Sequence, residues 1–156
     1  MCIESFTQAQ RLRKEGALIE SRSQLRTCAD SACPGPIAKD CSKWLEEVQA
    51  AIPTIVVAVR DRDGRDVVAA ELLVDGVVVT TSLDGKPIEV DPGPHTFRVK
   101  RVKETAQTMV VARAGDDNRV IELQLKGRGT DGPAPPPPPP GDEGASALLI
   151  SGGVLA

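Results

Sequence analysis

The sequence predicts an α+β protein: a three-helix unit comes first, a small antiparallel β-sandwich follows, and a disordered proline-rich tail ends the chain. Three observations predict this order. Apolar residues recur at helical spacing up to residue 52. Short β-branched runs separated by turn residues then fill residues 54–126. Residues 127–144 contain seven prolines among glycine and acidic residues, a composition that cannot bury a core.

The third helix of the predicted unit, residues 2–52, has the clearest amphipathic pattern. Its apolar residues fall on one stripe, which comprises Ile37, Cys41, Trp44, Leu45, Val48 and Ile52. Pro34 and Pro36 suit the start of this helix, where a missing N–H costs little, and Pro53 ends it. Because Gly16 interrupts the weaker stripes upstream, we expect three short helices that pack as antiparallel neighbours.

All four cysteines lie in this unit, at Cys2, Cys28, Cys33 and Cys41. We expect two disulfides, since an even number of clustered cysteines in a small unit is typical of them. A zinc site and buried reduced thiols are the alternatives, and the absence of a C-x-x-C pair disfavours zinc. The expected helix hairpin favours Cys2–Cys28 with Cys33–Cys41, and Cys2–Cys33 with Cys28–Cys41 is nearly as well supported.

The middle of the chain changes to short strands. We predict seven of them, over residues 54–59, 67–74, 77–79, 88–90, 95–102, 108–112 and 119–125. Asp75-Gly76 is the strongest hairpin signal, and Asp84-Gly85 marks another turn. Because no helical segment separates the strands, they predict an antiparallel sandwich rather than βαβ units.

The end of the chain has two parts. Residues 127–144 predict an extended polyproline II spacer. Residues 145–156 are apolar and uncharged, but twelve residues are too few to cross a bilayer, which needs roughly 20. We expect this segment to be the first half of a membrane anchor; a free tail, or a strip that packs back onto the protein, is the alternative.

Four segments of the predicted sandwich resemble a PEGA-type β-sandwich domain: residues 73–76, 84–90, 92–99 and 119–125. The turn from Leu12 to Gly16, with the helix after it, is similar to a tetratricopeptide hairpin. Together with the proline-rich stretch and the apolar end, these features resemble predicted cell-envelope proteins of myxobacteria. The resemblance implies a surface or envelope module and carries over no catalytic residue.

Composition excludes several classes of function. The net charge of −3 gives no basic excess for nucleic acid, and only three aromatic residues are present for base stacking. A single histidine excludes multi-histidine metal sites, and no phosphate-binding or nucleophile motif occurs. We therefore expect no enzyme activity, no cofactor and no metal.

The single basic cluster comprises Arg98, Lys100, Arg101 and Lys103. These residues are candidate contacts for an anionic glycan, a lipid headgroup or an acidic partner; a solvated hairpin is the plainer interpretation. We expect His95 to bond backbone or face water, and Trp44 to pack in the helical core.

These observations favour a non-enzymatic cell-envelope module, displayed on the proline-rich stalk, that engages a protein or a cell-wall component. Disulfides would place it in the periplasm or at the cell surface, with a membrane tether through residues 145–156 and beyond. Because no apolar leader precedes Cys2, this location requires a native start other than Met1. A soluble adaptor with reduced thiols, using the helical hairpin to bind a peptide, is the alternative, and a small hydrolase is the third hypothesis.

Overall fold

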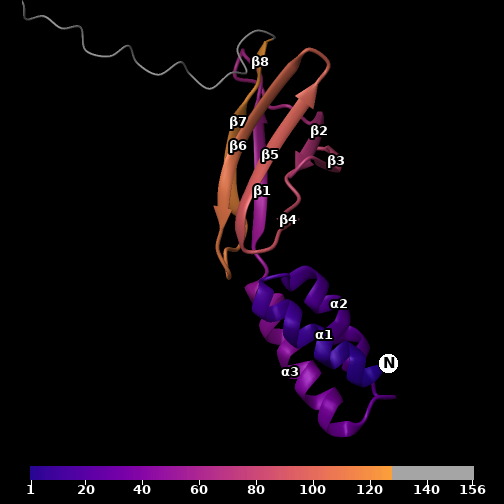
Figure 1. Ribbon diagram of the computed structural model, residues 1–156. Helices are drawn as coiled ribbons and strands as arrows, with labels where there is room; N and C mark the ends of the chain where they lie inside the picture. The colour runs from indigo at the N-terminus through magenta and orange to yellow at the C-terminus, as the bar shows by residue number, and fades with distance from the viewer. Residues whose placement is uncertain (128–156) are drawn as a thin grey trace, which may run out of the picture.

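The computed structural model describes residues 1–127. Within them, three helices precede eight strands arranged in two sheets, which confirms the α+β class. The helices form one end of the molecule and the strands the other (Figure 1). The predicted spacer, apart from Gly127, and the apolar segment 145–156 lie outside the described residues. No helix in the described part is long and apolar enough to cross a membrane.

The helical unit consists of α1 (Cys2–Glu15), α2 (Leu18–Cys28) and α3 (Gly35–Ala51). Gly16 ends α1 in a left-handed conformation with φ 79°, which glycine adopts without a steric penalty. Pro36 occupies the first turn of α3, as its fixed φ predicts. The stripes of the three helices meet in one core, formed by Ala9, Leu18, Leu25, Cys28, Cys41, Val48 and Ile52.

The strands form a sandwich. One sheet has the order β4-β1-β7, from Ile88–Glu89, Thr54–Arg60 and Arg119–Gln124. The other has the order β3-β2-β5-β6-β8, from Val77–Ser82, Ala69–Val74, Gly93–Arg101, Glu104–Ala112 and Lys126–Gly127. Alternate residues from both sheets face a shared core, in which Ile55, Leu72, Phe97, Val99 and Leu125 are fully buried.

The expectation of an entirely antiparallel sandwich is wrong for one pair of strands. β1 and β7 run parallel, from Ile55 opposite Arg119 to Arg60 opposite Gln124. The reason lies where the chain returns to the start of β1: the Thr54 N–H donates to the carbonyl of Asp116 at 3.0 Å. β7 therefore begins beside the beginning of β1 and runs in the same direction.

The β5–β6 hairpin is longer than predicted. Nine residue pairs join the strands, from Gly93 opposite Ala112 to Arg101 opposite Glu104, and only Val102 and Lys103 form the turn. The prediction ended one strand at residue 102 and began the next at 108. The polar residues in between extend β6, because outward positions of a solvated sheet face accept polar side chains.

The loop between β4 and β5 joins the sandwich to the helices. The carboxylate of Asp91 accepts the Ile19 N–H at 2.9 Å, which supplies a cap to α2, a helix whose own N-cap residue is Ala17. Arg22 of α2 forms a two-contact ion pair with Glu89, and its Nη2 lies 2.9 Å from Oε1. Polar contacts, in addition to the covalent chain, therefore join the sandwich to the helical unit.

Candidate functional site

Two disulfides stabilise the helical unit, as expected, but the preferred pairing is wrong. Cys2 is bonded to Cys33 and Cys28 to Cys41, with Cα–Cα distances of 5.7 and 5.8 Å. Cys41 lies almost two turns inside α3, on its buried face, where it meets Cys28 at the end of α2. Cys33 lies in the connection before α3 and reaches back to the start of α1. The choice between the two pairings depended on the path of that connection, which the sequence pattern does not predict.

Bridged cysteines indicate an oxidising environment, because thiols in a reducing cytosol are kept reduced. All four cysteines of the sequence are bonded. Cys28 and Cys41 are fully buried in the helical core, so their bond also contributes to the packing of that core.

The four residues of the basic cluster come together at the β5–β6 turn. Phe97 and Val99 of β5 point into the core. Arg98 and Lys100 alternate with them along the strand and therefore lie on the outer face of the five-stranded sheet. Lys103 lies in the turn itself. Arg98, Lys100 and Lys103 border a shallow hollow of about 200 Å³, which Val102, Glu104 and Thr105 also line. We call Arg98, Lys100 and Lys103 the basic face.

Arg101 differs from the other three cations. Its Nε–H donates to the Glu104 carboxylate at 2.9 Å, so its charge is neutralised across the first pair of the hairpin. Within residues 1–127, Arg98, Lys100 and Lys103 form no ion pair. Glu71, which is opposite Lys100 in the β2–β5 register, does not pair with it either. The basic face therefore carries three cations that form no direct ion pair within the described residues.

The loop between β1 and β2 lies near the same end of the sandwich and is partly acidic. Its Asp61 carboxylate turns inward and accepts the backbone N–H groups of Asp63 and Arg65 at 2.9 and 3.0 Å. The bond from Arg65 is the main reason that the pKa of Asp61 lies below its ordinary value. The Asp61 carboxylate is thus used within its own loop, which forms a polar turn.

His95 lies at the other end of β5 and holds a turn in place. Its Nδ1 lies 2.6 Å from Asp75 Oδ2, and its Nε2 lies 2.6 Å from the carbonyl oxygen of Asp91. Because both neighbours are acceptors, both ring nitrogens donate only in the protonated imidazolium. Burial alone lowers the pKa of His95, but the bond to Asp75 and the Asp91 carbonyl raise it by more, so the net pKa lies above the ordinary value. His95 is thus engaged in structure.

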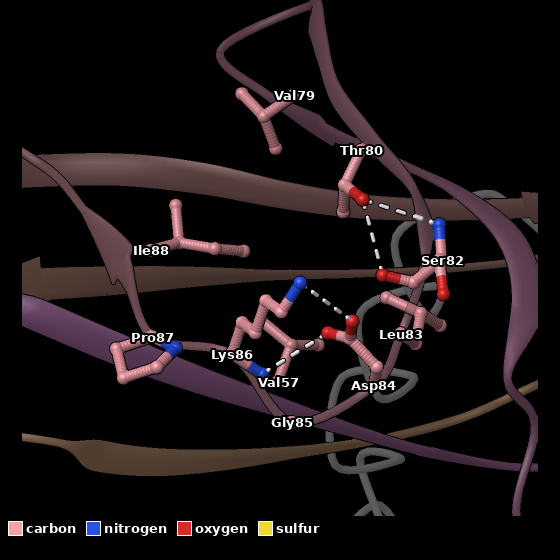
Figure 2. Close-up of a pocket in the computed structure, with 10 residues that line it drawn as sticks. All are labelled: Val57, Val79, Thr80, Ser82, Leu83, Asp84, Gly85, Lys86, Pro87 and Ile88. Atoms are coloured by element: carbon pink, nitrogen blue, oxygen red, sulfur yellow. Dashed lines mark hydrogen bonds and ion pairs between the residues drawn. The ribbon is translucent and has the colours of Figure 1, made fainter.

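A second hollow, of about 320 Å³, is lined by residues of β3, of the β3–β4 loop and of β4, together with Val57 of β1 (Figure 2). Val57 and Ile88 line its apolar side, and the ion pair of Lys86 Nζ with Asp84 Oδ2, at 3.4 Å, lies at its rim. The Thr80 hydroxyl is bonded to the backbone of Ser82 at both its donor and its acceptor sites. This hydroxyl is therefore held in the fold of β3.

Trp44 packs in the helical unit as expected. Its ring stacks on Phe6 with centroids 5.2 Å apart, and the Arg13 guanidinium lies 5.0 Å from the ring. Arg13 in turn bonds Glu47 at 3.0 Å. The indole is held between its neighbours and serves the packing of α1 against α3.

The described residues contain no cluster of three or more histidine, cysteine, aspartate or glutamate side chains suited to a metal ion. A scan against protein-family models and a search of curated proteins find no match to the chain. The resemblances to PEGA-type domains and tetratricopeptide hairpins therefore stay predictions.

Sequence reasoning found the basic cluster but missed two features of it. It did not separate Arg101 from the others, although the spacing to Glu104 permits a pair across a two-residue turn. It also missed Val102, the completely exposed residue at the tip of the hairpin. A β-branched residue between basic residues, at the point where two alternating runs meet, is the signal that would have identified it.

Proposed function

We propose that the protein is a non-enzymatic interaction module of the cell envelope, which uses the basic face to bind anionic groups of its partner. The observation that carries this proposal is a set of three cations on one exposed surface, Arg98, Lys100 and Lys103, none of which forms an ion pair with another residue of the described range 1–127. Clustered like charges repel one another, so an anion bound among them relieves that repulsion as well as gaining its own attraction.

The contrast with Arg101 supports this assignment. One guanidinium in the same hairpin is paired with Glu104, at a side-chain exposure of 35%. The three residues of the basic face lie around the hollow instead, where Thr105 adds a hydroxyl donor. Phosphate and carboxylate groups are the anions that such donors bind most strongly.

The two disulfides support a site of action outside the reducing cytoplasm, in the periplasm or at the cell surface. The adaptor alternative requires four reduced thiols, and a count of free thiols in protein purified without reductant distinguishes the two. We expect no free thiols. Four reactive thiols in that preparation would favour the adaptor.

Binding of the full chain to long-chain inorganic polyphosphate tests the anion-binding part. We compare the variant R98Q/K100Q/K103Q with K14Q/K39Q/K43Q, which removes the same charge from exposed sites on the helices. The first variant should lose roughly 100-fold in affinity, at about fivefold per charge. The control should bind nearly as the wild type. Equal losses in both variants would show that net charge, not the basic face, attracts the ligand.

A further inference from the structure

We infer that the basic face docks on an anionic lipid surface, with Val102 as an apolar tip that enters the headgroup layer. This inference rests on the proposed function and names its partner. Its main support is Val102, because an exposed apolar side chain contributes nothing to the binding of an anionic polymer in water. Val102 is 100% exposed, more than any other large apolar residue of the described chain.

The backbone at this residue gives an independent reason. Val102 has φ 39°, in the left-handed region that glycine and asparagine tolerate and β-branched residues avoid. Among residues 1–127, the other non-glycine residues with positive φ are Asp75 and Asn118, and aspartate and asparagine both tolerate this region. Residues with local backbone strain of this sort cluster at active sites, ligand clamps and switch regions. The hairpin keeps a valine where a small or polar residue would form the turn with less strain.

The spacing of the cations behind the tip fits a membrane surface. At about 3.3 Å per residue, Lys100 lies roughly 7 Å behind Val102 along β5, and Arg98 roughly 13 Å behind it. The headgroup layer is about 5–7 Å deep on each side of a bilayer. When Val102 reaches the acyl boundary, Lys100 and Lys103 lie at headgroup depth, and the long side chain of Arg98 extends toward the surface from the same sheet face.

The direction of the chain agrees with this orientation. β8, the last described element, pairs with Glu104 and Thr105 beside the turn, at the end of the sandwich far from the helices (Figure 1). The described part of the chain therefore ends at the same end of the sandwich that carries the tip.

Vesicle co-sedimentation of the full chain tests the inference. Phosphatidylcholine vesicles with phosphatidylglycerol should bind the protein, vesicles of phosphatidylcholine alone should bind it far more weakly, and high salt should release it. The key variant is Val102→Asn, because asparagine tolerates the left-handed backbone while removing the apolar tip. Its vesicle affinity should fall about tenfold, from the apolar burial that is lost. Its polyphosphate affinity and its thermal stability should not fall.

Val77→Asn is the matched control, since Val77 is 65% exposed but lies beside the β2–β3 turn, level with the middle of β5 rather than with its tip. This variant should bind both vesicle types as the wild type does. Equal vesicle binding by wild type and Val102→Asn, with polyphosphate binding intact, would overturn the lipid inference and leave the proposed function standing. If R98Q/K100Q/K103Q binds polyphosphate and vesicles as tightly as the wild type, the proposed function itself fails.

Discussion

Replacing His95 with glutamine tests whether its imidazolium stabilises the β2–β3 turn and the β4–β5 loop. In the protonated ring, Nδ1–H donates to the Asp75 carboxylate and Nε2–H donates to the Asp91 carbonyl, each at 2.6 Å. Asp91 also caps α2 through its carboxylate. The substitution therefore weakens one turn of the sandwich and the loop that contacts the helices.

The expected cost depends on pH. A hydrogen bond to a charged group contributes about 1.5–3 kcal/mol, and the bond to Asp75 is of that kind. Because folding raises the pKa of His95, its contribution is complete below the unfolded value of 6.5 and is lost as the pH rises through the folded pKa. The deprotonated ring has one N–H for two acceptors, so the difference between wild type and variant should fall below about 1 kcal/mol there. The bond from His95 is the main reason that the pKa of Asp75 is lowered. Below about pH 4, protonation of Asp75 should therefore also remove the contribution of this bond to stability.

Urea unfolding of wild type and His95→Gln across this pH range measures the difference. Since His95 is the single histidine of the sequence, NMR of its ring protons gives the folded pKa without ambiguity. Asp75→Asn serves as the second arm: it should lower that pKa and reduce the pH dependence. A stability difference that stays constant from pH 6 to 9, or a ring pKa below 6.5, would refute the reasoning.

Three other changes should separate the contributions of the core, the bridges and the junction. Cys28→Ala/Cys41→Ala should cost roughly 3 kcal/mol in urea unfolding, because that bridge closes a loop with a sequence separation of 13; an unchanged midpoint would contradict the pairing. Phe97→Ala should cost about 3–5 kcal/mol, since its ring is fully buried, whereas the exposed Met109→Ala should cost less than about 0.5 kcal/mol. Asp91→Ala should cost about 1 kcal/mol and increase amide exchange at the start of α2, and unchanged exchange there would argue against the cap.

Much of the architecture follows from local signals in the sequence. Gly16 and Pro36 mark helix ends correctly, and Asp75-Gly76 forms the hairpin turn it predicts. Periodicity indicates which face of a strand is buried, but not the direction of its neighbour. The parallel β1–β7 pair depends on where the chain returns after β6, a tertiary contact between Thr54 and Asp116 that no local pattern contains.

The candidate site could be predicted only in part, again because local patterns do not contain tertiary contacts. The run from Arg98 to Lys103 identifies the basic cluster, because alternation on a strand places Arg98 and Lys100 on one face. The pairing of Arg101 requires the strand register and the two-residue turn, which fix Glu104 opposite it. The conformation of Val102 also follows from that turn, so the most informative residue of the surface is visible only after the hairpin has folded.

Amide NMR during titration of the oxidised full chain with short-chain inorganic polyphosphate tests the central claim most directly. The account predicts saturable shifts concentrated in residues 98–105, which fade as salt is added. Shifts centred on the exposed lysines of α3, or no saturable shift in the β5–β6 hairpin, would contradict it.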